Sequence, residues 1–250
     1  MRETVFPGID RSIVADDGDA FTFCSTCAFS RACLSQGMDK SSLRDLHMLV
    51  EHVGPLRAGD HVFREGDPFE AIAAVRAGTV KTYTVDRDGR EHVLGFHLPG
   101  EVIGLNAIAG DRFPCNAVAL DTATLCRFSF PKISVLATRL PGVQQTLFRL
   151  LSRDIGAASL LAGDWSADAR MAAFLVGLSR RLEARGFSAR RFQLTMGRAD
   201  IANYLRLAPE TVSRVLKRFQ DEGMIRVDRR EVELVAPDAL VAVAGAMLRE

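Results

Sequence analysis

The chain has 250 residues, of which 48% are hydrophobic and 25% are charged, an ordinary globular composition that excludes a disordered or fibrous protein. The 32 basic and 31 acidic residues nearly cancel, so the net charge favours neither a nucleic-acid partner nor an acidic ligand. Their distribution is more informative. Residues 170–230 carry 14 Lys and Arg against 6 Asp and Glu, which leaves 18 basic and 25 acidic residues in the rest of the chain. One basic segment therefore stands within an acidic chain.

The N-terminal region argues against export and membrane insertion. No stretch reaches the roughly 18 uncharged apolar residues that a membrane span needs, and Asp10, Asp16, Asp17 and Asp19 lie where a signal peptide needs an apolar core. We therefore expect a cytoplasmic protein with no membrane association. Thiols stay reduced in that compartment, so the five cysteines favour metal binding, redox chemistry or simple burial over a disulfide framework.

The first half of the chain has the pattern of an antiparallel β structure. Between Pro55 and Phe130, glycines divide the sequence into short segments, and residues 79–85 and 92–97 read as strands. This pattern is typical of a sandwich or jelly roll. We predict an antiparallel β domain over residues 41–138, preceded by a cysteine-rich segment over residues 1–40.

The next block changes to a helical period and predicts one long amphipathic helix, which begins near Pro141 and occupies residues 139–164. Its apolar residues fall on one face at steps of three and four, and they are Leu147, Leu151, Ile155, Ala158 and Leu161. Residues 163–166 break this helix, and Ser166 is placed to cap a following helix over residues 167–185.

The C-terminal part, residues 165–250, reads as a winged helix-turn-helix domain. A short strand at 192–194 precedes two helices, 198–205 and 209–220, whose spacing is that of a helix-turn-helix pair. Residues 224–227 and 231–235 read as a two-stranded wing, and 237–249 as a short final helix. The predicted fold class is therefore α+β: an antiparallel jelly roll, a long amphipathic helix and a winged helix-turn-helix.

The second helix of the pair presents a polar face suited to DNA. Glu210, Ser213, Arg214 and Lys217 share one face by the helical step, and Arg218 lies beside them. Arginine can grip guanine with two hydrogen bonds, a carboxylate can accept from cytosine, and serine and lysine suit phosphate or base contacts. Such a run of charges is also compatible with a solvated, salt-bridged helix face. The basic excess and the wing favour DNA binding.

Cysteine spacing is the second chemical signal. Cys24, Cys27 and Cys33 lie within ten residues, close enough for one loop to wrap a single inorganic centre. Tetrahedral zinc and a cubane iron–sulfur cluster both require four ligands, so the fourth must be Cys115 or Cys126. The spacing does not distinguish these two, and the remaining cysteine is expected to be a small buried core residue.

Three stretches resemble the Crp-Fnr superfamily, and specifically its oxygen-responsive fumarate and nitrate reductase regulator branch. They are Cys24-x2-Cys27-x5-Cys33; Gly95-Phe-His-Leu-Pro-Gly100 with Val102-Ile-Gly104; and Leu194-Thr-Met-Gly-Arg-Ala-Asp-Ile-Ala-Asn-Tyr-Leu205 with Glu210-Thr-Val-Ser-Arg214. The last contains the E-x-x-S-R recognition element of the family. The resemblance covers nearly the entire chain.

The resemblance implies a homodimeric transcription regulator, not an enzyme, that binds an inverted repeat of TTGAT-like half-sites in double-stranded DNA and works with RNA polymerase. It implies that residues 1–40 are the cluster-binding segment, that residues 41–138 form a β-roll sensor domain, and that residues 139–164 form a dimerisation helix that pairs through its apolar face. It implies an oxygen-labile 4Fe-4S cluster on four cysteines that promotes dimerisation and DNA binding, and so controls genes of anaerobic or low-oxygen metabolism. The family's distal cysteine follows a segment like Ala119-Leu-Asp-Thr122 and precedes one like Phe130-Pro131. By this match, the metal ligands are Cys24, Cys27, Cys33 and Cys126, and Cys115 is not one.

Two positions depart from the family pattern near the reading face. Arg206 stands where the family usually has Gly in the turn between the two helices, and Ala208 stands where it usually has a capping Ser or Thr. Loss of the cap is expected to cost about 1 kcal/mol of helix stability, which Pro209 at the first helical position offsets in part.

Four alternative functions remain open. A cyclic-nucleotide regulator shares the β-roll, but the stretches at 104–107 and 112–115 lack the carboxylate and the hydroxyl of its phosphate pocket. A zinc-stabilised DNA-binding protein remains open because four thiolates do not choose their metal. An electron-transfer protein or redox enzyme would leave the recognition helix without a role. A haem-responsive regulator would need an axial histidine, and the candidates are His47, His52, His61, His92 and His97.

Overall fold

The computed structural model describes residues 24, 27, 33–36, 38 and 40–248. Most of the predicted segment 1–40, and the last residue of the predicted helix 237–249, lie outside the described residues. The chain divides into two compact units, residues 1–153 and residues 154–250. The division falls inside the long helix, and each unit is described by itself. None of the described helices is long and apolar enough to cross a membrane.

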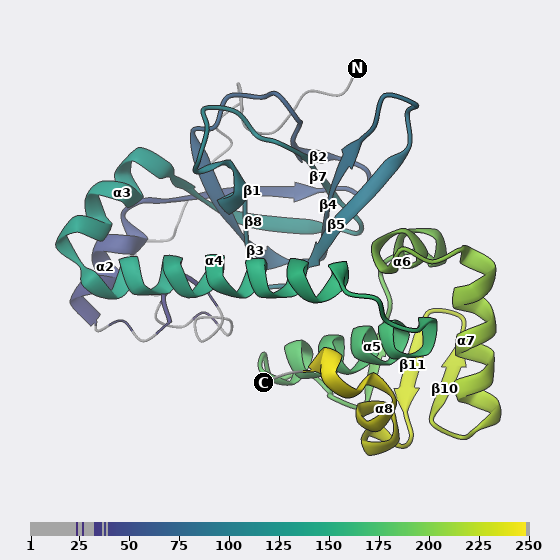
Figure 1. The fold of residues 1–250 in the computed structure, drawn as a ribbon. Helices are drawn as coiled ribbons and strands as arrows, with labels where there is room; N and C mark the ends of the chain where they lie inside the picture. The colour runs from purple at the N-terminus through teal and green to yellow at the C-terminus, as the bar shows by residue number, and fades with distance from the viewer. Residues whose placement is uncertain (1–23, 25–26, 28–32, 37, 39, 249–250) are drawn as a thin grey trace. The chain divides into compact units, whose positions relative to one another are not determined.

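Within the described residues, the first unit contains two antiparallel four-stranded sheets (Figure 1), which confirms the predicted β-roll. The strand order is β1-β8-β3-β6 in one sheet and β2-β7-β4-β5 in the other. The strands are β1 Val50–Leu56, β2 His61–Phe63, β3 Ala71–Ala77, β4 Val80–Val85, β5 Glu91–His97, β6 Val102–Ile103, β7 Asn116–Ala119 and β8 Ala123–Ser129. A short 3-10 helix, η1 Leu105–Ala107, follows β6.

The two sheets enclose a hydrophobic cluster that we call the inner core. It includes alternate residues of β3 and β8, together with the rings of Phe63 and Phe113, which stack with centroids 3.8 Å apart. Gly78, between β3 and β4, shows how tightly the turn is closed: its φ is +79°, and a Cβ there would lie 2.4 Å from the Thr122 carbonyl oxygen. Only glycine fits this backbone position.

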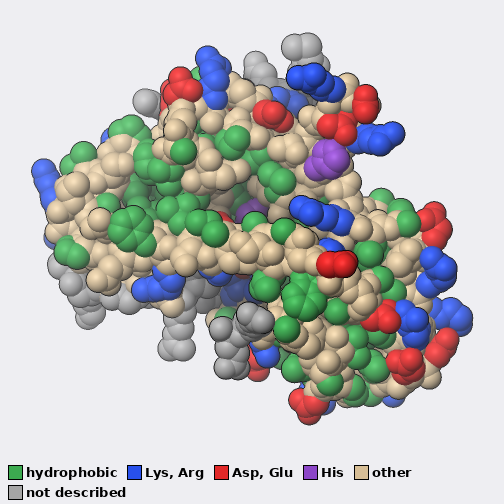
Figure 2. All heavy atoms as spheres, in the orientation of Figure 1, with side chains coloured by type: hydrophobic (Ala, Val, Ile, Leu, Met, Phe, Trp, Pro, Cys, Tyr) green, Lys and Arg blue, Asp and Glu red, His purple; other side chains and the backbone are tan. Residues whose placement is uncertain are grey.

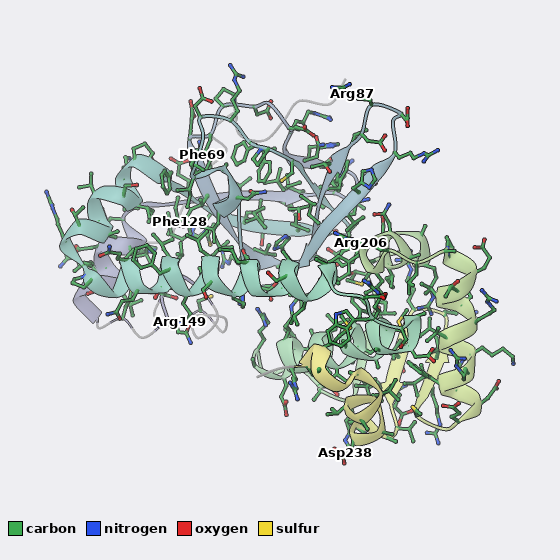
Figure 3. All side chains as sticks on the ribbon, viewed as in Figure 1. Phe69, Arg87, Phe128, Arg149, Arg206 and Asp238 are labelled. Carbon is green, nitrogen blue, oxygen red and sulfur yellow. The ribbon has the colours of Figure 1, made fainter. Side chains whose placement is uncertain are left out.

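Three helices cover the other side of the first sheet and form a second cluster, the outer core. The helices are α2 Lys40–His47, α3 Phe130–Arg139 and α4 Pro141–Ala162. The buried members of the outer core are Leu34, Leu46, Ile72, Ala74, Val102, Leu105, Phe128, Ile133, Leu136, Val143, Leu147 and Leu150. Phe128 lies between the sheet and these helices (Figure 3). The long helix was expected from its period, whereas α2 and α3 were not, because each is short and packs by tertiary contact.

The second unit has the predicted winged helix-turn-helix elements. They are α5 Ala167–Glu183, β9 Arg191–Gln193, α6 Arg198–Leu205, α7 Pro209–Asp221, β10 Ile225–Asp228, β11 Glu231–Leu234, α8 Pro237–Ala244 and η2 Gly245–Leu248. The three strands pair antiparallel in the order β10-β11-β9. Ser166 caps α5 as expected, since its hydroxyl accepts a hydrogen bond from the Ala169 backbone N–H at 3.1 Å.

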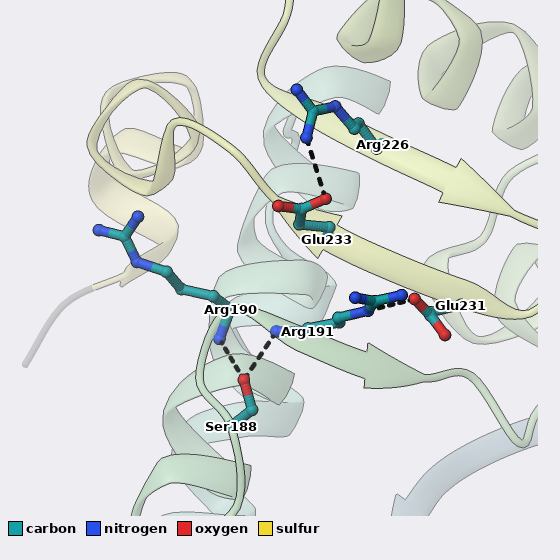
Figure 4. Close-up of polar contacts among 6 residues, drawn as sticks. All are labelled: Ser188, Arg190, Arg191, Arg226, Glu231 and Glu233. Atoms are coloured by element: carbon teal, nitrogen blue, oxygen red, sulfur yellow. Dashed lines mark hydrogen bonds and ion pairs between the residues drawn. The ribbon is translucent and has the colours of Figure 1, made fainter.

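The solvent face of the three-stranded sheet carries a row of alternating charges (Figure 4). Arg226 of β10 pairs in register with Glu233 of β11, which in turn pairs with Arg191 of β9. The Arg226 guanidinium lies 3.3 Å from Glu233, and Arg191 contacts Glu231. Such exposed pairs contribute little to stability, but they keep this sheet face charged and in register.

Candidate cysteine site and nucleic-acid interface

Cys33 and Cys126 pack against the same hydrophobic cluster, the outer core. Cys126 lies on β8, directly across from His52 on β1 and Ala74 on β3. Side chains alternate along a strand, so Leu125 points into the inner core while Cys126 points to the helix-covered face. The strand register therefore brings two of the predicted ligands, distant in sequence, to one side of one sheet.

The four predicted ligands also share one electrostatic environment. Burial raises the pKa of Cys126 to about 12, and Cys33, Cys24 and Cys27 add to the rise by charge repulsion. Burial raises the pKa of Cys24 to about 11, and Cys33 and Cys27 again add to the effect. Arg76 of β3 opposes both shifts. Mutual repulsion of this kind requires that the thiols lie near one another.

Cys115 lies on the opposite side of the same sheet, in the inner core, with 1% of its surface exposed. Its sulfur accepts a hydrogen bond from the Asn106 side chain at 3.3 Å. Burial raises the pKa of Cys115, and the charged neighbour that adds to the rise is Glu65 rather than another thiol. The geometry thus separates the two cysteines that spacing alone did not distinguish.

The donor set fits a four-thiolate centre in its chemistry, since both a cubane iron–sulfur cluster and tetrahedral zinc take four cysteine sulfurs. Among the described residues, no group of three or more His, Cys, Asp or Glu side chains is close enough to hold a metal ion. The four thiols of this structure therefore lie near one another without forming the tight arrangement of bound ligands.

Two further residues lie beside the cysteines: His52, which the sequence named only as a possible haem ligand, and Arg76, which it did not single out. The Nδ1 atom of His52 lies 3.8 Å from the Cys126 sulfur, and the Arg76 guanidinium is the positive group that acts on Cys24 and Cys126. Their positions follow from strand pairing, so no local sequence signal marks them. Groups of this type, next to ligands, orient sulfurs and tune a bound centre.

The structure does not favour the haem reading, because the other histidines are engaged elsewhere in the β-roll. His61 lies 3.0 Å from the Tyr83 hydroxyl, His97 lies 3.0 Å from the Thr82 hydroxyl, and His92 lies 2.9 Å from Asp86. His47 is on α2. These residues lie on three separate elements, α2, β2 and β5.

In the stretch 112–115, where the cyclic-nucleotide alternative would need a small hydroxyl after arginine, Phe113 packs among aromatic side chains. Phe113 is 1% exposed, stacks on Phe63, and meets the Phe69 ring edge-on with centroids 5.4 Å apart. Arg112 is exposed and donates to the Gly66 carbonyl at 2.6 Å. The Arg112 guanidinium therefore holds the loop that contains Gly66.

The recognition helix α7 has one buried and one exposed face. Val212, Val215, Leu216 and Phe219 are buried, and they fix the rotation of the helix about its axis. The opposite face carries Glu210, Ser213, Arg214 and Lys217, all of which are exposed. Basic and acidic side chains gather along the outer side of this helix (Figure 2). The predicted polar face is therefore presented to solvent.

The side chains of this face have few competing contacts. The Ser213 hydroxyl donates to the Pro209 carbonyl at 3.1 Å, and Arg214 donates to the Thr211 hydroxyl at 3.2 Å. Lys217 lies 3.7 Å from Asp221. Arg218 differs from the others because its guanidinium forms an ion pair with Asp168 of α5. Arg218 is therefore the residue of this set that contacts another helix, whereas the contacts above for Ser213, Arg214 and Lys217 lie within α7.

The turn between the two helices shows both departures from the family pattern. Arg206 takes the left-handed conformation, with φ 56° and ψ 43°, which explains why glycine is usual there. Ala208 is the N-cap of α7 in extended conformation, and it provides no side-chain hydrogen bond to the helix. Pro209 occupies the first turn, where its missing N–H costs nothing.

Restoring the cap should stabilise the second unit. Ala208→Ser places a hydroxyl where it can accept a hydrogen bond from a free N–H of the first turn, and the gain is expected to be about 1 kcal/mol. Urea unfolding would measure it, with Ala184→Ser, at the exposed C-cap of α5, as the control without effect. An unchanged unfolding midpoint for Ala208→Ser would show that the cap is irrelevant here.

The predicted dimerisation stripe on α4 is divided by burial. Leu147 is buried in the outer core and Leu151 packs against it, so both contact their own unit. Ile155 is 66% exposed and Ala158 is exposed. Phe148, which the sequence reading left out, is 60% exposed and lies seven residues before Ile155, on the same helix face. Leu161 is half-buried.

Comparison with known proteins agrees with this architecture. The family described as Crp-like helix-turn-helix domain matches residues 169–243, and the cyclic nucleotide-binding domain family matches residues 54–139. The structure of FixK2 from Bradyrhizobium japonicum is similar with a TM-score of 0.71 and 28% identity, and the match covers 78% of this chain and 98% of FixK2. The cyclic nucleotide family name describes the β-roll.

Two curated relatives cover almost the whole chain. The transcriptional activator protein Anr of Pseudomonas aeruginosa is 41% identical over 228 residues, covering 90% of this chain and 93% of the relative. The fumarate and nitrate reduction regulatory protein of Escherichia coli is 38% identical over 231 residues, covering 91% and 92%. Both names describe regulators and not enzymes. With its β-roll, its winged helix-turn-helix and these relatives, the chain belongs to the Crp/Fnr family of transcription regulators.

Proposed function

We propose that this protein is an oxygen-responsive transcription regulator whose Cys24, Cys27, Cys33 and Cys126 hold a 4Fe-4S cluster. The observation that supports this most is the shared environment of these four thiols, from which Cys115 is separated by a sheet. Relatives named as fumarate and nitrate reduction regulators add to the support. When bound, such a cluster supplies a centre that oxygen destroys.

The structure offers a physical connection between the cysteines and α4. The turn after Cys33 is closed by a hydrogen bond from the Gln36 N–H to the Cys33 carbonyl at 3.1 Å. The Gln36 side chain accepts a hydrogen bond at 2.9 Å from Arg149. Figure 3 shows Arg149 on α4. Leu34, in the same turn, is fully buried in the outer core with Leu147. A shift of this turn would therefore act directly on the helix.

We infer that α4 pairs with its counterpart in a second copy and that the loaded cysteine site favours this pairing. Of the predicted stripe, Leu147 and Leu151 pack against their own unit, so pairing would use Ile155, Ala158 and Leu161, together with exposed Phe148. Two such helices can bury these side chains against each other in coiled-coil fashion. Leu147 and Leu151 hold α4 against the outer core of its own unit.

Ile155→Asp should abolish the dimer and leave the subunit folded. Because Ile155 is 66% exposed in the single chain, a carboxylate there costs the subunit little but must be desolvated when two helices pair. Sedimentation of protein kept free of oxygen measures the result, with Val135→Asp at another exposed apolar position as control. A dimer that survives Ile155→Asp would refute the assigned stripe. Wild-type protein should become monomeric in air.

In the dimer, two α7 helices would meet successive major grooves about 34 Å apart on one face of the duplex. We propose that the site is an inverted repeat of TTGAT-like half-sites, in which Arg214 contacts guanine and Glu210 accepts from cytosine on the opposite strand. Ser213 would lie near a thymine or a phosphate, and Lys217 and Arg218 near phosphates. Since relatives are named transcriptional activators, we propose RNA polymerase as a further partner.

Metal analysis of protein purified without oxygen tests the proposed cofactor against its rival, zinc. Four thiolates accept either centre, so the iron, sulfide and zinc contents of the purified protein distinguish the two. We expect about four iron and four acid-labile sulfide per subunit for a full cubane cluster, with a brown colour that fades in air. One zinc per subunit and no sulfide would establish the zinc-stabilised regulator instead.

A further inference from the structure

Arg170 of α5 donates hydrogen bonds to four backbone carbonyls. Its Nε bonds the Trp165 carbonyl at 3.2 Å, and its Nη2 bonds the Gly163 carbonyl at 2.8 Å. Its Nη1 bonds the carbonyls of Leu161 at 3.1 Å and of Leu205 at 3.4 Å. All five residues lie in the unit 154–250, so one side chain joins three separate segments of that unit.

Two of the four acceptors belong to the ends of helices. Leu161 is in the last turn of α4, and Leu205 is the last residue of α6. The final carbonyls of a helix lack intrahelical partners and carry partial negative charge. A guanidinium suits them because it is permanently charged and presents five donors in a rigid plane. Arg170 therefore holds the C-terminal ends of α4 and α6 at a set distance from each other.

The connection between α4 and α5 is itself held in place. The Trp165 indole N–H donates to the Leu160 carbonyl at 2.9 Å, and the ring lies so close to Gly163 that a Cβ there would be 2.3 Å from the indole nitrogen. Ser166 then caps α5. Because Arg170 binds the carbonyls on both sides of Asp164, the connection between α4 and α5 is a joint of fixed geometry.

The first turn of α5 also holds the recognition helix. Asp168, two residues before Arg170, forms the ion pair with Arg218 in the last turn of α7. The Leu205 carbonyl bound by Arg170 directly precedes Arg206, whose left-handed conformation sets the direction of the turn into α7. The same turn of α5 thus contacts α6 at its end and α7 at its end.

We propose that Arg170 is a positioning residue that sets the direction of the reading helix relative to the end of the dimerisation helix. This inference rests on the proposed function, because it concerns how two recognition helices of a dimer meet two half-sites. A joint of fixed geometry selects one separation between half-sites. Without this joint, each α7 can still read its own half-site, but the distance between the two α7 helices of the dimer is no longer fixed.

The spacer length of the DNA site provides the test. Binding is measured on inverted repeats whose half-sites are separated by the best spacer and by one base pair more or fewer, a shift of about 3.4 Å. Wild-type protein should prefer the best spacer strongly. Arg170→Lys keeps the charge but not the planar fork, so its preference should fall by about fivefold to tenfold, as expected when pre-organisation is lost. The salt slope should not change, since no phosphate contact is removed.

Arg180→Lys is the matched control, because Arg180 lies on the same helix and is exposed; it should keep the wild-type preference. Arg170→Gln serves as a second variant, and circular dichroism checks that each protein is folded. A wild-type spacer preference in a folded Arg170 variant overturns the inference, even if affinity drops. Failure of both variants to fold also overturns it, because the role is then folding. A wild-type protein that binds no inverted repeat overturns the proposed function itself.

Discussion

Cys126→Ser, purified without oxygen, should lose its iron, whereas Cys115→Ser should keep it. Cys126 lies on the helix-covered face of the sheet with Cys33, and its pKa responds to the other three thiols. A serine hydroxyl is a poor replacement for a thiolate ligand, so three remaining cysteines should not retain a four-ligand centre. Iron and sulfide content of the two variants, normalised to wild type, measures the difference.

The comparison separates loss of iron from loss of stability, because Cys115 is the more buried of the two residues. Serine in the inner core introduces a hydroxyl where 1% of the surface is exposed, which should cost about 1–3 kcal/mol of stability. Cys115→Ser should therefore melt earlier and still contain iron, and Cys115→Ala should contain iron with a smaller loss of stability. If Cys115→Ser loses iron while Cys126→Ser retains it, the two roles must be exchanged.

Arg214→Ala should flatten the base preference at one G·C pair of each half-site. Arg214 is exposed on α7, where it donates a hydrogen bond to the neighbouring Thr211 hydroxyl, so the guanidinium is accessible to DNA. A good bidentate contact to guanine contributes about 1–3 kcal/mol of discrimination. Binding to a panel of half-site variants at several salt concentrations measures both the preference and the salt slope.

Lys217→Ala provides the contrasting pattern. A lysine that contacts phosphate contributes to every sequence alike, so its loss should weaken all sites and lower the salt slope by roughly one unit. Arg218→Ala should do the same and should also destabilise the second unit, because it breaks the ion pair with Asp168. If Arg214→Ala weakens all sequences equally and keeps its base preference, Arg214 is a phosphate contact and the readout scheme is wrong.

The elements with strong local signals could be predicted from the sequence. The pair α6 and α7 has short-range periodicity, a proline in the first turn of α7 and Gly223 just beyond its end, all of which act within a few residues. Ser166 caps α5 for the same local reason. The short helices α2 and α3 escaped prediction because burial of Leu46 and Ile133 against the sheet, rather than local propensity, keeps them helical.

The candidate site could be predicted only in part. Three clustered cysteines were visible in the sequence, but the choice between Cys115 and Cys126 depends on which sheet face each side chain meets, and strand pairing decides that. The contacts of Arg170 were invisible because its partners are backbone carbonyls, which any sequence supplies. Likewise, Leu147 followed the helical stripe, yet its own unit buries it.

DNA binding by one oxygen-free sample, measured before and after exposure to air, tests the central claim most directly. The probe is an inverted repeat of TTGAT half-sites at fixed salt, and iron content is followed in the same sample. We expect tight binding by the iron-loaded protein and a loss of affinity of at least tenfold, about 1.4 kcal/mol, as iron is released. Unchanged affinity in a sample that has lost its iron would contradict the proposal that the cysteine site controls DNA binding.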